Sequence, residues 1–144
     1  MIRIAVLIML SCLPCARSFG GEAPAASVLV VAGLKEDKGQ LRIGVFADAA
    51  SWLGPAPRFS RVLPVKREAD GTMRVELPAD LPARVAVAVV HDLDGSGEMN
   101  RNAVGMPTEP YGFSNNHRPR FGPPSFQAAL VDPRAAGGPR FEVR

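Results

Sequence analysis

Apolar and polar residues alternate along much of the chain after residue 26, and this period of two is typical of β-strands that bury one face. In Thr72–Leu77, for example, Met73, Val75 and Leu77 share one face and polar side chains share the other. Clusters of glycine, proline and aspartate separate the alternating runs and predict turns between them. The expected strands are Ser27–Leu34, Gln40–Phe46, Arg61–Lys66, Thr72–Leu77, Arg84–Val90, Phe126–Val131 and Pro139–Arg144.

About seven short strands without a convincing amphipathic helix predict an all-β fold, a single antiparallel β-sandwich of the immunoglobulin-like or transthyretin-like kind. Because Pro64 cannot donate a backbone hydrogen bond to a neighbouring strand, Arg61–Lys66 is expected at an edge of its sheet. Asp48–Pro55 fits a single helical turn capped by Asp48. The only tryptophan, Trp52, lies in this loop, and we expect it to be buried.

The first residues place Arg3 before an apolar run that extends to Leu13 and is followed by small residues. This arrangement is typical of a secretory signal peptide, and the run is too short for a transmembrane span. We therefore expect a signal peptide over residues 1–20, a β-sandwich domain over residues 21–144, and a periplasmic or extracellular location. A minor alternative is a lipid anchor through Cys12. Both cysteines lie in the leader, so we expect no disulfide framework in the mature chain.

The charge balance gives little reason to expect a nucleic-acid partner. The full chain has a formal net charge of +3, but Arg3 and Arg17 belong to the expected leader. The remaining 15 basic and 14 acidic side chains leave a net charge of +1, which is not a strongly basic surface. We therefore expect no nucleic-acid partner, and no transmembrane segment in the mature chain.

One long interval, His91 to Ser125, interrupts the rhythm of strands and turns. It contains five of the 14 prolines and no strand-like run. Loops of this length in a compact domain are usually functional or disordered. This interval carries enough apolar and aromatic residues to pack on the sandwich. We therefore expect an ordered excursion between a strand that ends near Val90 and a strand that begins near Phe126.

The start of this interval, DLDGSGEMN, matches the front of an EF-hand-type calcium loop. Carboxylates at positions one and three, oxygen-bearing side chains at five and nine, and glycine at six can converge on one hard cation. Position twelve is Ala103 instead of a bidentate glutamate, so Asn102 or the distant Glu109 would have to replace that ligand. The candidate metal-binding residues are Asp92, Asp94, Ser96, Glu98 and Asn100, with calcium as the candidate ion. The alternative is a glycine-rich turn whose aspartates cap backbone N–H groups.

Other chemistry in the interval is less well supported by the sequence. A transition-metal pair of His91 and His117 with Asp92 lacks a recognised ligand spacing. The interval contains no nucleophile-elbow motif. Three titratable groups, His91, Asp92 and Glu109, nevertheless leave an alternative hypothesis, an envelope hydrolase or lyase that acts on glycan or peptide. Arg118, Arg120 and the nearby Tyr111, Phe113 and Phe121 could form an aromatic and basic binding surface. We instead expect the arginines to be solvated and the aromatic rings to pack under the loop.

The strings GLKEDKGQLRIGVF and HDLDGSGEMNRNAVGMPTEPYGFSNN, with FGPPSF further on, resemble the exported bacterial domain-of-unknown-function family numbered 2141. The resemblance implies a secreted or periplasmic β-sandwich and brings no established activity. It also implies an Asp-rich loop similar to calcium-stabilised turns of bacterial surface sandwiches. The positions that match are His91, Asp92, Asp94, Gly97, Glu109, Tyr111, Gly112, Phe113, Ser114, Asn115 and Asn116.

The sequence thus favours an exported, non-enzymatic β-sandwich module with a binding or structural role in the bacterial envelope. Its partner would be an envelope protein or a glycan. A third hypothesis is that the edge strand at Arg61–Lys66 accepts a strand from another protein. The candidate binding residues are His91, Glu109, Tyr111, Phe113, Ser114, Asn115 and Asn116.

Overall fold

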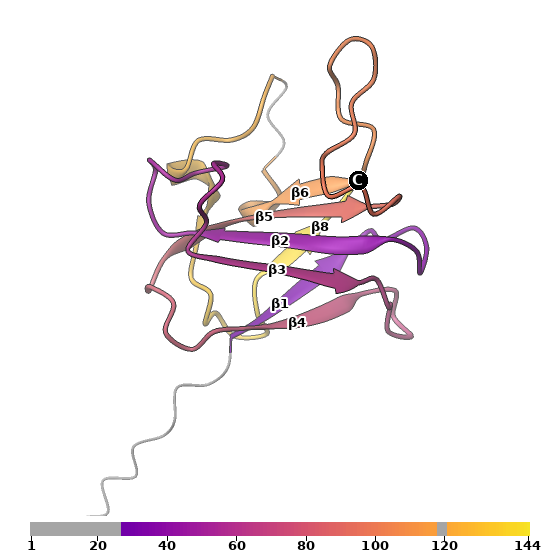
Figure 1. Cartoon of the computed structure of the whole chain (residues 1–144). Helices are drawn as coiled ribbons and strands as arrows, with labels where there is room; N and C mark the ends of the chain where they lie inside the picture. Colours follow the sequence, from indigo (N-terminus) through magenta and orange to yellow (C-terminus); the bar gives the residue numbers. More distant parts are fainter. Residues whose placement is uncertain (1–26, 118–120) are drawn as a thin grey trace, which may run out of the picture.

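The computed structural model describes residues 27–117 and 121–144, which form two packed β-sheets (Figure 1). One sheet has the strand order β4-β1-β8, and the other has the order β3-β2-β5-β6 with β7 also paired to β5. This arrangement confirms the prediction of an all-β sandwich, with eight strands instead of about seven. The strands are β1 (Ser27–Ala32), β2 (Gln40–Phe46), β3 (Phe59–Pro64), β4 (Met73–Leu77), β5 (Val85–Asp92), β6 (Tyr111–Phe113), β7 (Leu130–Val131) and β8 (Arg140–Glu142).

The core lies between the two sheets and follows the alternation seen in the sequence. In β5, Val85, Val87 and Val89 are completely buried, while the small side chains between them face the outside of the sandwich. The same alternation buries the apolar side chains of β2 and β4. The opposing residues come from both sheets: Leu29, Val31, Leu41, Ile43, Val45, Met73, Val75, Leu77, Phe141 and Val143. Burial of this set supplies the main driving force for folding.

Strand β5 is the centre of the larger sheet. It pairs antiparallel with the whole length of β2, from Gln40↔Asp92 to Phe46↔Ala86. Its other side is shared by two short strands, because β6 pairs with Ala88–Val90 and β7 pairs with Val85 and Ala86. The long interval therefore leaves the sheet at the end of β5 and returns to the same strand.

The smaller sheet departs from a purely antiparallel arrangement. Strand β1 is antiparallel to β4 but parallel to β8. After β8, the backbone of Arg144 exchanges two hydrogen bonds of 3.2 Å with the backbone of Tyr111 in β6, which links the two sheets at one side. This close approach requires glycine at position 112, where a Cβ atom would lie 2.9 Å from the carbonyl oxygen of Glu142.

The long interval is ordered over its described residues, but the prediction that it lacks strand structure was wrong. It contains β6 and the short 3-10 helix η1 (Ser114–Asn116). Three residues are too few for a periodic pattern to indicate a strand. Residues 118–120, which include Arg118, lie outside the described part of the chain.

The predicted strand at Phe126–Val131 was largely wrong as well. Only Leu130–Val131 is extended, because the preceding residues form the 3-10 helix η2 (Gln127–Ala129). The Ser125 hydroxyl accepts the backbone N–H of Ala128 at 3.2 Å and thereby stabilises this turn. Alanine has a low preference for β-strands, and these alanines have no β-branched residue between them. The strand is therefore not favoured over the 3-10 helix here.

Three smaller predictions, on the edge strand, the helical turn and the burial of Trp52, had different outcomes. Strand β3 pairs with β2 alone among the described residues, which confirms its position at an edge. The segment after β2 forms turns instead of a helical turn, although Asp48 does accept the backbone N–H of Ser51 at 2.8 Å. Trp52 is half-buried against Phe46, and its indole N–H donates to the carbonyl of Pro124 at 2.9 Å.

The expected signal peptide, residues 1–20, and the alternative anchor Cys12 lie outside the described residues. Among the residues that are described, no helix has the length and apolar character needed to span a membrane.

The packing of the core leads to a first prediction. Leu41 is completely buried in β2, so Leu41→Ala should lower the free energy of unfolding by about 2–5 kcal/mol in denaturant titrations. Val62 on the edge strand β3 is 52% exposed, and Val62→Ala should cost less than about 1 kcal/mol. Equal effects of the two substitutions would contradict the assignment of the core.

Candidate functional site

Three carboxylates converge where the long excursion leaves and rejoins the larger sheet. Asp92 ends β5, Asp94 follows two residues later, and Glu109 lies two residues before β6. Each of them offers one oxygen, and these oxygens lie within 4.8 Å of one another. The strand register explains this convergence. Because Val90 pairs with Tyr111 across the antiparallel strands, continuing the register outward brings position 92 opposite position 109.

Asp92 organises the glycine-rich turn. Its side chain is completely buried, and its two oxygens accept the backbone N–H groups of Ser96 at 3.1 Å and Gly97 at 2.9 Å. Gly97 has a φ of 82°, a conformation that glycine adopts without the strain of a Cβ atom. The nearest cation is Arg42 of β2, whose Nη1 lies 4.0 Å from Oδ2 of Asp92.

Glu109 closes the base of the excursion. It is 5% exposed, and its two oxygens accept the backbone N–H groups of Leu93 at 2.9 Å and Asn100 at 3.2 Å. The backbone N–H of Thr108 donates to the carbonyl of Asn100 at 2.9 Å. One carboxylate thus holds together residues that are sixteen positions apart, and it fixes the turn that Asp92 and Asp94 share.

Asp94 is the exposed member of the cluster. The side-chain amide of Asn100 donates to it at 2.7 Å, and the backbone N–H of Ser96 donates at 3.0 Å. These hydrogen bonds, that of Asn100 first, lower the pKa of Asp94 from 3.8 to about 2. All of its donors favour the ionised form, so Asp94 carries a negative charge at neutral pH.

The candidate metal-binding residues divide into two groups in the structure. Asp92 and Asp94 converge with Glu109, one of the two replacements considered for the missing ligand at position twelve. The other replacement, Asn102, instead accepts the backbone N–H groups of Val104 and Met106. The remaining three candidates, Ser96, Glu98 and Asn100, have other contacts or are exposed. The Ser96 hydroxyl contacts the backbone of Glu98, the Glu98 side chain is exposed, and the Asn100 amide bonds Asp94.

His91 lies next to this cluster in the sequence but is not part of it among the described residues. Its side chain is completely buried, and Nε2 lies 2.7 Å from the carbonyl oxygen of Lys38. Since a carbonyl only accepts, Nε2 carries the proton, and Nδ1 has no hydrogen-bond partner among the described residues. His117, the second histidine of the conceivable metal pair, is exposed after η1.

Ser114 is a structural link between strands. Its hydroxyl is completely buried, accepts the backbone N–H of Val87 at 2.9 Å and contacts the carbonyl of Ala129. Among the described residues, Val87 has no strand partner on this side, because β6 and β7 leave a gap between them along β5. The Ser114 hydroxyl therefore takes the place of the backbone carbonyl that would otherwise accept the N–H of Val87.

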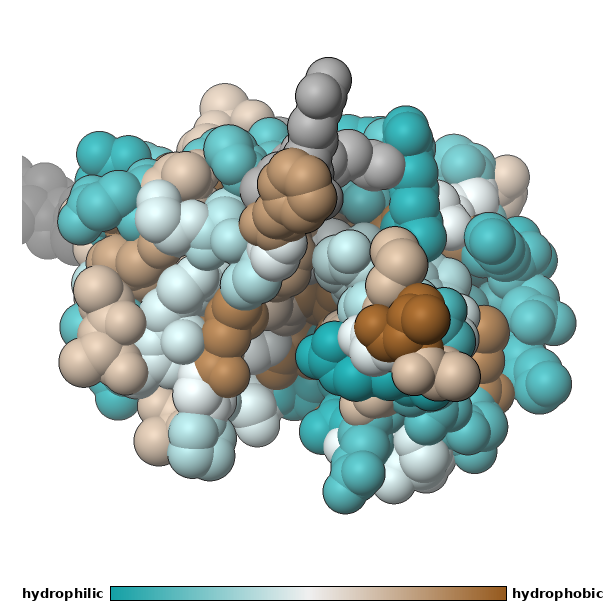
Figure 2. Space-filling model, turned by 90° about the horizontal axis from the view of Figure 1, so that it is seen from above, coloured by the Kyte–Doolittle hydropathy of each residue, from teal (hydrophilic) through white to brown (hydrophobic). Residues whose placement is uncertain are grey.

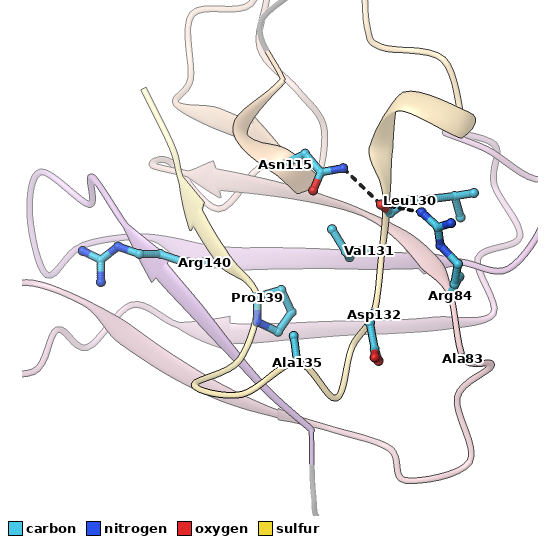
Figure 3. Close-up of a pocket in the computed structure, with 9 residues that line it drawn as sticks. All are labelled: Ala83, Arg84, Asn115, Leu130, Val131, Asp132, Ala135, Pro139 and Arg140. Atoms are coloured by element: carbon cyan, nitrogen blue, oxygen red, sulfur yellow. Dashed lines mark hydrogen bonds between the residues drawn. The ribbon is translucent and has the colours of Figure 1, made fainter.

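Asn115 and Asn116 continue this link. Both have positive φ, 63° and 50°, which asparagine tolerates better than most residues. The Asn115 amide donates at 3.0 Å to the carbonyls of Ala128 and Leu130, and Asn116 accepts the backbone N–H of Glu142 at 2.8 Å. Figure 3 shows Asn115 and Arg84 approaching the Leu130 carbonyl from two sides, above a hollow from which Arg140 points away. The three polar residues of Ser114–Asn116 therefore join β5, β7 and β8.

Tyr111 and Phe113 lie on the outer face of the larger sheet. Their rings have centroids 5.6 Å apart, and Phe113 also contacts Trp52 with centroids 6.0 Å apart. Tyr111 is 37% exposed, whereas Phe113 is half-buried. Of the candidate binding residues, these two are the ones whose side chains form an accessible apolar surface.

The fold and this site define a β-sandwich with an acidic loop clamped between two adjacent strands. A family model described as an uncharacterized protein conserved in bacteria (DUF2141) matches residues 29–137. The match extends over most of the sequence, so the chain belongs to this bacterial family, as the resemblance in its motifs predicted. Neither the curated proteins nor the solved structures gave a match to the chain.

The Ser114 link can be tested by mutation. Ser114→Ala leaves the buried N–H of Val87 without its acceptor, so we expect a loss of about 1–3 kcal/mol in the free energy of unfolding. Ser60→Ala on the exposed edge strand is the matched control and should change stability by less than about 0.5 kcal/mol. A neutral Ser114→Ala substitution would show that the hydroxyl is not needed to join these strands.

The lowered pKa of Asp94 gives a pH dependence of known sign. A carboxyl whose pKa is lower in the folded than in the unfolded state stabilises the fold above the unfolded value, and this contribution is lost as the pH falls. For Asp94 the loss should occur between about pH 4 and pH 2. Asp94→Asn should therefore make the thermal midpoint fall less steeply across this window, and an unchanged slope would contradict the assignment.

Proposed function

We propose that this protein is an exported, non-enzymatic β-sandwich module with a binding or structural role in the bacterial envelope, and that a calcium ion orders its long excursion. The leader-like pattern over residues 1–20 supports export. The convergence of Asp92, Asp94 and Glu109 within 4.8 Å is the observation that carries the metal site. The ligand set consists of the two aspartates of the predicted calcium loop, Asp92 and Asp94, completed by Glu109 from the far end of the excursion.

The chemistry of the donors suits a hard divalent cation. Calcium takes six to eight oxygen ligands, and carboxylates can provide one or two each. Each carboxylate offers about four acceptor positions, and the three side chains use only part of these for the N–H groups described above. The remaining ligands would come from backbone carbonyls of the turn and from water. The hydrogen bonds to backbone amides hold the carboxylates in place before an ion arrives.

The local charge also favours a cation. Three acidic side chains gather here, and among the described residues Arg42 is the basic side chain that ion-pairs with one of them, Asp92, at a distance of 4.0 Å. Asp92 and Glu109 are both buried, so water screens their repulsion poorly. A divalent ion would compensate the excess negative charge directly and would draw the two ends of the excursion together.

The hydrolase or lyase alternative requires His91 to reach a substrate together with Asp92 and Glu109. A general base must come within hydrogen-bond reach of the proton it removes. His91 is completely buried and its Nε2 faces the Lys38 carbonyl, which favours a role in holding the adjacent turn. The non-enzymatic hypothesis is therefore the one that the geometry supports better.

Calcium binding can be measured by thermal unfolding after treatment with a chelator. We expect millimolar calcium to raise the midpoint in a saturable way, and magnesium to do so much less because it loses its water reluctantly. Glu109→Gln should abolish most of the calcium-dependent shift. Glu98→Gln removes a charge from the same loop outside the cluster, and it should leave the shift intact.

Calorimetric titration with calcium provides the direct measurement of stoichiometry, which should be one ion per chain. The metal assignment would be wrong if wild-type protein showed neither heat of binding nor a thermal shift. It would also be wrong if Glu98→Gln removed the response as completely as Glu109→Gln, since that would indicate diffuse electrostatic attraction rather than a site.

A further inference from the structure

An apolar groove of about 710 Å³ lies on the outer face of the larger sheet, beside the excursion. Its floor is formed by Ala88 and Val90 of β5, whose side chains point away from the sandwich core. One wall is formed by Tyr111 and Phe113 of β6, and the other by residues of the excursion that include Met106. Figure 2 shows patches of hydrophobic surface, in brown, among hydrophilic surface on the face that is seen from above.

The groove exposes an unusual amount of apolar surface. Met106 is 62% exposed, and Phe121, which also lines the groove, is 92% exposed. Large apolar side chains that gather around one concavity indicate a ligand site more often than isolated exposed residues do. Met99 and Met106 add flexible walls, because the unbranched thioether side chain adapts to the shape of a ligand.

The polar groups around the groove restrict the class of ligand. The part of β5 that forms the floor is paired with β2 on one side and β6 on the other, and β6 is bonded in turn to Arg144. As far as the described residues extend, the floor therefore offers no free strand edge to which a peptide could add its backbone hydrogen bonds. A flexible aliphatic chain needs no such partners and fits a groove with this lining.

The positive charge of Arg101 determines which polar head group we expect the ligand to carry. Arg101 is the charged residue among the described residues that line the groove. Its Nη1 donates to the carbonyl of Gly105 at 2.9 Å, and none of the ion pairs within the described part of the chain involves its guanidinium. A guanidinium has five N–H donors in a planar fork that matches a carboxylate. The remaining donors can bind an anion.

We infer that this groove binds a free long-chain fatty carboxylate, with its aliphatic chain along Ala88 and Val90 and its carboxylate near Arg101. The inference names a ligand class for the binding role proposed above, and it uses a site separate from the Asp92–Glu109 cluster. The aromatic ring of Phe113, which lines the groove, contacts Trp52. The only tryptophan of the chain therefore reports on occupancy.

The test is a titration of the purified, calcium-saturated protein with decanoate, dodecanoate and tetradecanoate below their micellar concentrations, followed by Trp52 fluorescence and calorimetry. Affinity should rise about fourfold per buried methylene, hence roughly 15-fold for each step of two carbons. Met106→Glu should weaken binding at least about tenfold, because it removes an apolar wall and adds a charge of the wrong sign. Val104→Glu is the matched control in the same loop, since Val104 is 78% exposed and does not line the groove.

The head group is tested separately with the alcohols of the same chain lengths. Arg101→Gln should weaken binding of the acids severalfold and leave the alcohols nearly unaffected. Binding without chain-length dependence, equal losses in Met106→Glu and Val104→Glu, or tight binding of an apolar peptide but not of the acids would overturn the inference. A calcium-induced thermal shift without fatty-acid binding would refute the groove ligand alone, whereas failure of both would also remove the metal site.

Discussion

The backbone register between β5 and β6 is the constraint on which the site depends. The pairing of Val90 with Tyr111 determines that Asp92 and Glu109 approach each other, and it places Tyr111 and Phe113 along the outer face of β5. A shift of one residue would send every side chain of β6 to the opposite face of the sheet. The short strand is itself held by Ser114–Asn116 and by the backbone of Arg144. The position of this short strand therefore depends on hydrogen bonds to residues that are distant in the sequence.

The long strands could be predicted from the sequence because their alternation is a local property. β2, β4 and β5 each repeat apolar and polar positions often enough for the period to be clear, and their buried faces are the predicted ones. The short strand β6 could not be predicted, and β7 lay within a predicted strand that was too long, because the extended conformation of both depends on pairing with β5 and not on their own residues. The parallel pairing of β8 with β1 is likewise a property of the whole chain.

The candidate site was predictable in part for the same reason. Asp92 and Asp94 belong to a compact motif with recognisable spacing, so the sequence identifies them as a pair. Glu109 remained one option among two, because only the strand register decides which distant oxygen approaches the pair. Arg42 was missed, although its position opposite Val90 follows once β2 and β5 are aligned. The burial of His91 could not be predicted from the sequence either, because it depends on the segment around Lys38, which is close in space but distant in the sequence.

The parallel pairing of β1 with β8 has a consequence for the order in which the chain acquires its structure. Val30 pairs with Arg140, 110 residues later, so the smaller sheet cannot be completed until residue 140 is available. Contacts between such remote segments are slow to form, because the entropy of closing a long loop is lost before the contact is gained. A chain emerging from the ribosome would therefore leave the smaller sheet incomplete until β8 has been synthesised. Such a delay would suit the export proposed above, because a polypeptide that crosses a membrane through a narrow channel must do so before it folds.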